Sequence, residues 1–157
     1  MDTVLIAQAT REDAPVILAL QHKAYQSEAR LYNDWSIPPL TQTLKELEQE
    51  FQSNVVLKVI IENRLVGSVR ACMIEGVVQI GKLIVEPGMQ RQGIGGSLLQ
   101  AIESAFSSAV YFELFTGSRS EGNIRFYLKH GYVITHQEVL SPTVTFVYMR
   151  KSNEAAA

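Results

Sequence analysis

The stretch from Ile80 to Glu103 reads IGKLIVEPGMQRQGIGGSLLQAIE. Its apolar, strand-like run stops at Pro87, a polar turn follows, and a helical pattern begins after Gly93. At such a junction the unpaired N–H groups of the helix and the positive end of its dipole face the same point. The stretch therefore predicts a strand, a turn and a helix that together bind a phosphate group.

The hydrophobic periodicity predicts a mixed α/β order around this stretch. We expect helices at residues 10–24, 41–51, 94–106 and 123–131, and an irregular segment at 26–40. The helix at 94–106 should present an apolar stripe to the core, formed by Ile94, Leu98, Leu99, Ile102 and Phe106. We expect strands at residues 4–9, 55–61, 65–74, 77–85, 110–115, 132–140 and 143–149. The order β-α-α-β-β-β-α-β-α-β-β indicates an antiparallel meander, then a parallel strand after a helical crossover, in one mixed sheet with helices on both faces.

Length and composition restrict the class of protein. The chain has 157 residues, of which 46% are hydrophobic and 19% are charged. These values predict one globular domain, residues 1–151, followed by a disordered tail at 152–157. A net charge of −2 does not favour nucleic acid as a partner. With no membrane-length apolar run and no signal peptide, we expect a cytoplasmic protein that does not bind membranes.

The single cysteine, Cys72, lies in an apolar run. One cysteine allows neither an intrachain disulfide nor a cysteine-based zinc site, and no other spacing suggests a metal site. The glycines fit neither common nucleotide motif, because a dinucleotide fingerprint needs glycine where Leu98 stands and a P-loop needs lysine before Ser97. Taken alone, they are explained equally well by a phosphate loop and by close packing of a helix on a sheet.

The residues that flank the glycines separate these two interpretations. The run from Gln90 to Gly96, preceded by Leu83-Ile84-Val85-Glu86-Pro87, resembles the acyl-CoA loop of the GNAT superfamily of N-acetyltransferases. That loop reads Gln/Arg-x-x-Gly-x-Gly/Ala after a strand that ends in Val-x-Pro. The run from Phe126 to Tyr132, FYLKHGY, resembles the second signature of the same family. Together with the order of elements, the resemblance covers residues 4–150.

The resemblance implies acetyl-CoA as the cofactor. Backbone N–H groups of residues 90–95 would bind its pyrophosphate, and main-chain groups of the strand before the loop would bind the pantetheine arm. Many relatives have Asn seven residues before the motif tyrosine, where this chain has Ser120, so Asn123 is a displaced candidate. The expected cofactor-binding residues are Leu83, Ile84, Val85, Gln90, Arg91, Gln92, Gly93, Ile94, Gly95, Gly96, Ser97, Asn123, Arg125 and Tyr127.

The resemblance also implies N-acetylation of a primary amine by direct attack in a ternary complex. Tyr127 would be the general acid to the CoA thiolate, since a phenol and a thiol have comparable pKa values. The alternative is an aromatic side chain that only packs against the sheet. The general base is open: the glutamate of some relatives corresponds to Gln79, which cannot accept the proton, so Glu28, Glu75 and Glu113 are the candidates.

Acidic and aromatic residues between the first two expected helices indicate the acceptor site. In the family this region helps to wall that site, and carboxylates with aromatic rings suit a cationic amine. Glu28, Tyr32 and Trp35 are the expected substrate-binding residues, with Tyr25 and Asp34 beside them. The predicted partner is a small-molecule amine or a protein amine.

Two other classes of function remain open from the sequence. The chain could be a non-catalytic CoA-binding sensor or interaction module of the same fold, because Gln79 and the displaced Asn123 depart from the family pattern. It could also be an unrelated mixed α/β nucleotide-binding protein. A homodimer through the edge of the last hairpin, with Val144, Phe146 and Tyr148, is a further possibility.

Overall fold

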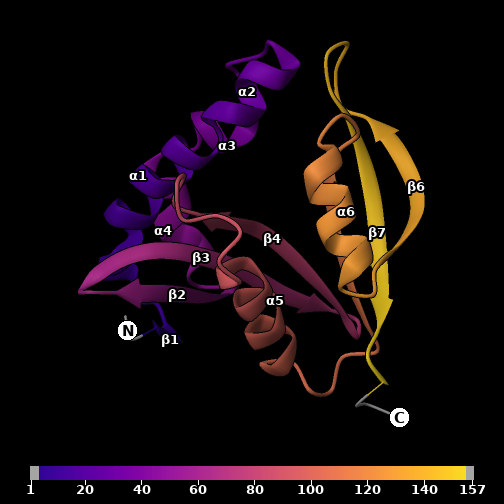
Figure 1. The fold of residues 1–157 in the computed structure, drawn as a ribbon. Helices are drawn as coiled ribbons and strands as arrows, with labels where there is room; N and C mark the ends of the chain where they lie inside the picture. The colour runs from indigo at the N-terminus through magenta and orange to yellow at the C-terminus, as the bar shows by residue number, and fades with distance from the viewer. Residues whose placement is uncertain (1–3, 155–157) are drawn as a thin grey trace.

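The computed structural model describes residues 4–154 as a seven-stranded mixed sheet in the order β1-β2-β3-β4-β5-β7-β6 (Figure 1). Residues 155–157 of the predicted tail lie outside the described residues. The strands are β1 (Val4–Gln8), β2 (Val55–Ile61), β3 (Arg64–Ile74), β4 (Val77–Val85), β5 (Tyr111–Gly117), β6 (Val133–Val139) and β7 (Thr145–Ser152). The helices are η1 (Arg11–Asp13), α1 (Ala14–Ala24), α2 (Gln26–Tyr32), α3 (Pro38–Thr41), α4 (Leu44–Glu50), α5 (Ile94–Ser104) and α6 (Glu121–Lys129). This architecture confirms the predicted mixed α/β fold.

The sheet is divided between β4 and β5. Strands β2, β3 and β4 form the predicted antiparallel meander, and β5 is parallel to β4, as expected from the helical crossover. The β4–β5 pairing covers only Val77–Gln79 of β4 and Tyr111–Glu113 of β5. Residues 80–85 and 114–117 are therefore not paired with each other, and Figure 1 shows the two halves of the sheet diverging there.

Helices cover both faces of the meander half of the sheet. Ile94, Leu98, Leu99 and Ile102 of α5 are buried against strand residues of the main core, which confirms these four positions of the predicted apolar stripe. The opposite face holds a second cluster in which α1 and α4 pack on β2 through residues such as Ile17 and Leu47. Burying each such aliphatic side chain contributes about 1.5–3 kcal/mol. The divided sheet is thus held by α5 from one face and by α1 and α4 from the other.

The segment predicted to be irregular contains two short helices, so that prediction was wrong. Ala29 and Tyr32 of α2 are buried with Ile37 against Val144, which precedes β7. The helix ends at Asn33, whose left-handed φ of 49° is typical of a helix C-terminus. Seven residues are too few for a stable isolated helix. Contacts with a distant hairpin, which local periodicity cannot reveal, therefore stabilise α2.

Two predicted helices begin later than expected. Helix α4 starts after Thr43, where Thr43 Oγ1 accepts a hydrogen bond from Glu46 N and Glu46 Oε1 accepts one from Thr43 N. This reciprocal pair is a capping box and ends the extended approach to the helix. Helix α1 starts at Ala14 after the single 3₁₀ turn of η1, in which Thr10 N donates to Asp13 Oδ2 over 2.9 Å.

The last hairpin has a different edge from the one expected. Strand β7 lies between β5 and β6, so Phe146 and Tyr148 are in an interior strand, and Val144 is buried. Strand β6 forms the edge of the sheet and exposes Val133 and Val139. The prediction of an apolar edge at residues 144–148 was wrong because the hairpin places its second strand against β5.

Candidate active site

The loop between β4 and α5 begins at a buried carboxylate. Glu86 is only 8% exposed and forms ion pairs with Lys23 at 2.7 Å and Arg64 at 3.0 Å. Its backbone N–H donates to the Val66 carbonyl over 2.8 Å. Glu86 thus joins the end of β4 to α1 and to β3, and gives the following loop a defined starting point.

The loop ends at a helix terminus with free N–H groups. Gly93 precedes α5 with a φ of 82°, and Arg91 has a φ of 66°. The first hydrogen bond into the helix runs from Ser97 N to Gly93 O over 3.0 Å. Because the N–H groups of residues 94–96 precede it, they have no acceptor within the helix. An 11-residue helix with this entry presents an anion-binding N-terminus.

The glycines of this loop serve different purposes. A Cβ atom at Gly93 would meet no atom within 4 Å, so Gly93 is required by its left-handed backbone. A Cβ atom at Gly95 would lie 3.4 Å from Phe126 Cζ, and one at Gly96 would lie 3.0 Å from His130 Nε2. Gly96 therefore lets α5 approach the end of α6 closely, whereas a Cβ atom at Gly95 would make an ordinary contact. The close-packing interpretation holds for Gly96, and the phosphate-binding interpretation stays a prediction.

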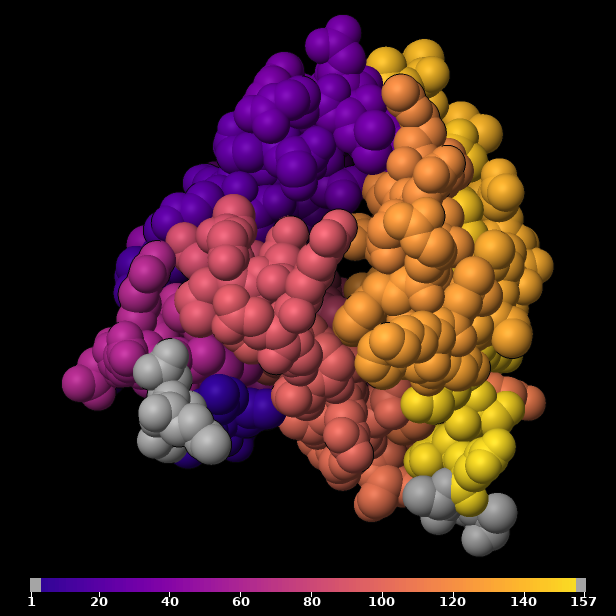
Figure 2. Space-filling model, viewed as in Figure 1, coloured from indigo at the N-terminus to yellow at the C-terminus, as the bar shows by residue number. Residues whose placement is uncertain are grey.

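A cleft of about 580 Å³ lies where β4 and β5 diverge. Figure 2 shows a hollow between the loop that enters α5 and the residues of α6. Of the residues predicted for the site, the cleft is lined by Glu28, Tyr32, Leu83, Val85, Gln90, Arg91, Gly93, Ile94, Gly95, Gly96, Asn123 and Tyr127. Residues from three distant parts of the sequence are thus brought together.

The other predicted residues lie outside this cleft. Ile84 is 3% exposed and belongs to the core. Gln92 and Ser97 are exposed to solvent, and Arg125 is 4.0 Å from Glu121 on the outer surface of α6. Trp35 is 51% exposed and does not line the cleft.

Tyr127 reaches the cleft from α6. Its ring makes edge contacts with Phe126 and Tyr132, with centroids 5.2 Å and 5.9 Å apart. Its hydroxyl group has no hydrogen-bond partner among residues 4–154, and so is available to a ligand. Burial, together with Tyr25 and Glu28, raises the pKa of the Tyr127 phenol well above 10. The group is therefore a protonated donor at neutral pH.

Tyr25 is a second phenol of the cleft. Burial raises the pKa of Tyr25 to about 12, with the nearby Arg70 charge acting in the opposite direction and Glu28 in the same direction. Tyr25 ends α1 and was expected only as part of an acceptor wall. Its sequence neighbours carry no motif that would distinguish it from a surface aromatic residue.

Helix α2 is joined to the start of α6 by polar contacts. The Tyr32 hydroxyl lies 2.9 Å from Ser120 Oγ and accepts a hydrogen bond from Arg119 N over 2.9 Å. Glu28 accepts hydrogen bonds from Ser120 Oγ over 2.5 Å and from Asn123 Nδ2 over 3.4 Å. The two polar positions considered for the family's asparagine, Ser120 and Asn123, therefore both contact Glu28.

Glu28 is the one carboxylate that lines the cleft among the described residues. Glu113 pairs with Arg150 at 2.8 Å, and Glu75 lies in the turn between β3 and β4. Among residues 4–154, no group of three His, Cys, Asp or Glu side chains is arranged to hold a metal ion. Of the three predicted candidates for the general base, only Glu28 lines the cleft.

Lys82 lines the cleft and was missed by the sequence analysis. It has a left-handed φ of 52° and stands at a register shift between β3 and β4. Ser68 pairs with Ile84 and Arg70 pairs with Gly81, so the two residues 82 and 83 face Val69 alone. A lysine in an apolar strand looks like an ordinary surface residue, and only the bulge directs it into the cleft.

Comparisons with known proteins agree with this geometry. The acetyltransferase (GNAT) domain family matches residues 24–153. The chain therefore belongs to the GNAT acetyltransferase family, which confirms the family predicted from its sequence. No curated protein sequence matches the chain. Among residues 4–154, no helix combines the length and the apolar content that a membrane span requires.

Solved structures share the fold at low sequence identity. PaiA N-acetyltransferase of Thermoplasma acidophilum, in complex with coenzyme A, is 15% identical with a TM-score of 0.78, covering 96% of this chain and 99% of that one. The ribosomal-protein-S18-alanine N-acetyltransferase of Escherichia coli is 13% identical with a TM-score of 0.79, covering 96% and 94%. YncA of Salmonella typhimurium, a putative acetyltransferase with its cofactor acetyl-CoA, is 15% identical with a TM-score of 0.76, covering 97% and 95%.

Proposed function

We propose that this protein is an N-acetyltransferase that transfers the acetyl group of acetyl-CoA to a primary amine. The observation that carries the proposal is a convergence on one cleft. The N-terminus of α5, the unpaired part of β4 and the Tyr127 phenol all face the space between the two halves of the sheet. Coenzyme A and acetyl-CoA are bound in two of the similar structures.

The pyrophosphate and the pantetheine arm of the cofactor would contact two different parts of the cleft. Its pyrophosphate would lie against the N–H groups at the start of α5, where each charge-assisted hydrogen bond contributes about 1.5–3 kcal/mol before ordering costs. Arg91 lines the same end of the cleft. The pantetheine arm would lie along Leu83 and Val85, whose main-chain groups have no partner in β5.

The reaction would proceed by direct attack in a ternary complex. The neutral amine nitrogen bonds to the thioester carbon, and the C–S bond breaks as the Tyr127 hydroxyl gives its proton to the departing thiolate. The amide nitrogen loses one proton, which returns to the Tyr127 oxygen directly or through water. An alkylammonium must first lose a proton, which costs about 4–5 kcal/mol at pH 7. Glu28, which lines the cleft, would collect that proton, directly or through water.

The raised pKa of Tyr127 determines what this phenol contributes. A buried phenol with a pKa far above that of a thiol is a poor full proton donor, because each unit of mismatch costs about 1.4 kcal/mol. Its hydrogen bond to the sulfur is nevertheless strengthened as negative charge develops during C–S cleavage. Tyr127 therefore acts mainly in the transition state.

Binding and turnover can be measured separately. Calorimetry should show binding of CoA and acetyl-CoA at micromolar levels, and a free-thiol assay with a panel of amines should show acetyl-CoA-dependent release of CoA. Binding of CoA with no thiol release for any amine would favour the sensor or interaction module. Binding of ATP or NAD without binding of CoA would favour an unrelated nucleotide-binding protein.

The remaining features of the proposal follow from the same assignment. The acceptor is a small-molecule or protein amine, and the enzyme works in the cytoplasm without nucleic acid or membrane. A homodimer, and a single domain at residues 1–151, stay predictions. Size-exclusion chromatography with light scattering tests the dimer, and limited proteolysis tests the domain.

A further inference from the structure

The cleft residues contributed by α3, by the ends of β5 and β7 and by the hairpin loop are mostly apolar, and the part that they line is here called the distal cleft. Pro38 and Pro39 come from α3, and Leu140 from the hairpin loop. Phe115 of β5 and Phe146 of β7 form a tilted aromatic pair with centroids 4.5 Å apart. These walls suit an apolar portion of a ligand.

A single cation interrupts these apolar walls. Lys82 is half-buried, and its ammonium group has no hydrogen bond and no ion pair among residues 4–154. Lys23, Lys58 and Lys151 each pair with a carboxylate. A partly desolvated ammonium group without a counter-ion is unfavourable. The β-bulge nevertheless holds Lys82 in this position, so the cleft keeps an unmatched positive charge.

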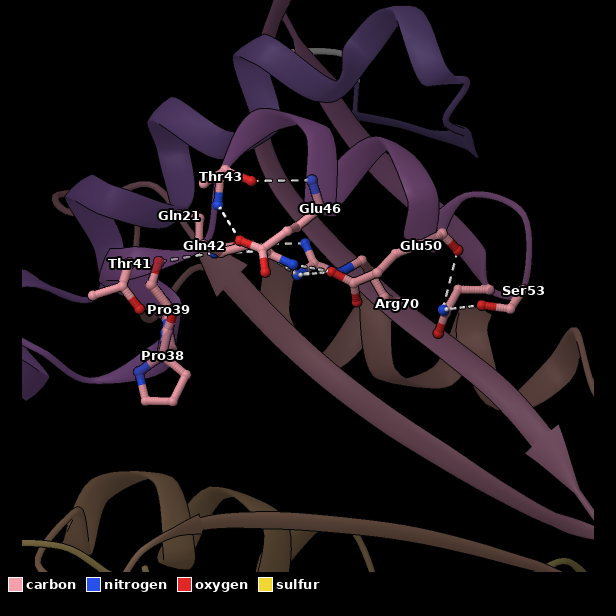
Figure 3. A network of polar contacts seen from close by, with 11 residues as sticks. Gln21, Pro38, Pro39, Thr41, Gln42, Thr43, Glu46, Glu50, Ser53 and Arg70 are labelled. Carbon is pink, nitrogen blue, oxygen red and sulfur yellow. Dashed lines mark hydrogen bonds and ion pairs between the residues drawn. The ribbon is translucent and has the colours of Figure 1, made fainter. Parts of the chain in front are cut away.

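The charges around Lys82 come from several elements. Arg70 of β3 is 2% exposed and donates to Gln21 Oε1 over 3.0 Å and to Gln42 Oε1 over 3.2 Å (Figure 3). Glu50 of α4 is 3.4 Å from Arg70 Nη2 and also accepts a hydrogen bond from Gln42. Burial and then the Arg70 charge lower the pKa of Lys82, while Glu50 acts in the opposite direction. Glu50 is thus already engaged by Arg70 and Gln42.

A negative charge lines the same cleft, because Glu28 and Lys82 are both among its lining residues. Tyr25, which also lines the cleft, interacts electrostatically with Arg70 and with Glu28. Tyr127 also interacts with Glu28. An acceptor whose amine approaches Glu28 and Tyr127 would direct its other groups towards Lys82 and the aromatic pair.

We propose that the acceptor is an amino carboxylate with an apolar remainder, whose carboxylate pairs with the Lys82 ammonium group while the remainder contacts Phe115 and Phe146. This inference rests on the proposed acetyltransferase function and specifies its substrate class. It departs from the cationic acceptor that the acidic sequence around Glu28 suggested. A cationic acceptor would need several free acidic groups in the cleft. Asp34 instead accepts hydrogen bonds from Ser36 and Thr143, and it does not line the cleft.

Space for the carboxylate is present beside Lys82. A Cβ atom at Gly81 would meet no atom within 4 Å, although Gly81 lines the cleft. Gly81 pairs with Arg70 across β3 and β4, so a side chain there would stand on the same face as Arg70. Gly81→Leu should therefore fill the space beside Lys82 and raise the KM for the acceptor.

The test compares matched amines in the free-thiol assay. Leucine and phenylalanine are paired with isoamylamine and phenethylamine, which lack only the carboxylate, and aminophosphonates replace the carboxylate by a different anion. We expect kcat/KM to be at least about 10-fold higher for the amino carboxylate. Lys82→Met should abolish this preference mainly through KM, Lys82→Arg should retain it in part, and the exposed Lys45→Met is the matched control.

A measurement of acceptor binding keeps the proposal testable without turnover. Calorimetry of the amino carboxylate with CoA-loaded protein should show binding that Lys82→Met weakens by at least about 10-fold. Equal activity on both members of each pair, a preference for polyamines, or a preference unchanged by Lys82→Met would overturn the proposal. Acetylation of Lys82 itself, seen by mass spectrometry, would also overturn it. If the unaltered protein neither binds CoA nor releases it from acetyl-CoA with any amine, that result would instead count against the proposed function.

Discussion

The hydroxyl group of Tyr32 fills the space that a side chain at Gly117 would need, so α2 can approach the end of β5 only because residue 117 is glycine. In this position the Tyr32 hydroxyl contacts Ser120 and the backbone N–H of Arg119. Helix α2, which also carries Glu28, is thereby fixed against the start of α6. One close contact thus connects the acceptor wall to the helix that carries Tyr127.

Gly117→Ala should displace α2 from α6. The added methyl group overlaps the Tyr32 ring and hydroxyl, and we expect a loss of about 2–3 kcal/mol in the free energy of unfolding, with a lower kcat/KM. Denaturant unfolding and the free-thiol assay measure both effects. In the double variant with Tyr32→Ala the overlap disappears, so the two losses should not add. Strict additivity would contradict the assignment.

Gly93→Ala should weaken CoA binding, in addition to the loss of stability that any alanine with a left-handed backbone causes. Gly93 has a φ of 82°, which costs an alanine residue about 1–2 kcal/mol. Gly76, in the β3–β4 turn, has the same φ of 82° and lies away from the cleft, so Gly76→Ala is a matched control for this strain. We expect calorimetry to show at least 10-fold weaker CoA binding for Gly93→Ala alone. Equal effects on CoA binding in both variants would exclude a special role for Gly93.

Tyr127→Phe should lower kcat with little change in CoA affinity. The phenyl ring keeps the edge contacts with Phe126 and Tyr132 and loses only the hydroxyl group. General acid catalysis typically contributes about 10²–10⁴-fold, and the raised pKa places this enzyme at the lower end. Steady-state kinetics with calorimetric CoA binding measures the separation. Full turnover in a folded Tyr127→Phe protein would show that the hydroxyl group has no catalytic role.

Arg70→Met should lower stability by about 2 kcal/mol. The methionine fills much of the buried volume, but the buried Gln21 and the half-buried Gln42 both lose a charged donor. Arg64→Met is the control, because the Arg64 side chain is 62% exposed although it also pairs with a glutamate. Urea unfolding of the two variants should differ clearly. Similar small losses would mean that the buried network contributes little beyond its apolar contacts.

Acid should remove a contribution that Asp13 makes to stability. Burial alone would raise the pKa of Asp13, but hydrogen bonds from Thr10 and the ion pair with Lys58 at 2.9 Å outweigh it and lower the pKa below 3.8. A lowered pKa in the folded state stabilises the protein above about pH 4, and this stabilisation is lost as the pH falls through the folded-state pKa.

Unfolding measured from pH 7 to pH 3 tests this linkage. Asp13→Asn should be less stable than the unaltered protein by about 1 kcal/mol at neutral pH, and the difference should shrink below pH 4. The neighbouring exposed Glu12→Gln should show no comparable change. A difference between Asp13→Asn and the unaltered protein that stays constant down to pH 3 would show that the Asp13 charge does not stabilise the fold.

The sequence by itself determined the family, the order of helices and strands along the chain, the apolar stripe of α5 and the strand–turn–helix junction around Gly93. These features depend on local periodicity, on turn residues and on motif spacing, all of which lie within short stretches of chain. Only the tertiary structure decided that α2 is helical, that Gly96 serves the packing of α5 on the end of α6, and that Lys82 lines the cleft while Trp35 does not. Each of these depends on residues far apart in the chain, such as Tyr32 with Gly117 or Gly96 with His130, and on a one-residue bulge that reverses the direction of a strand side chain.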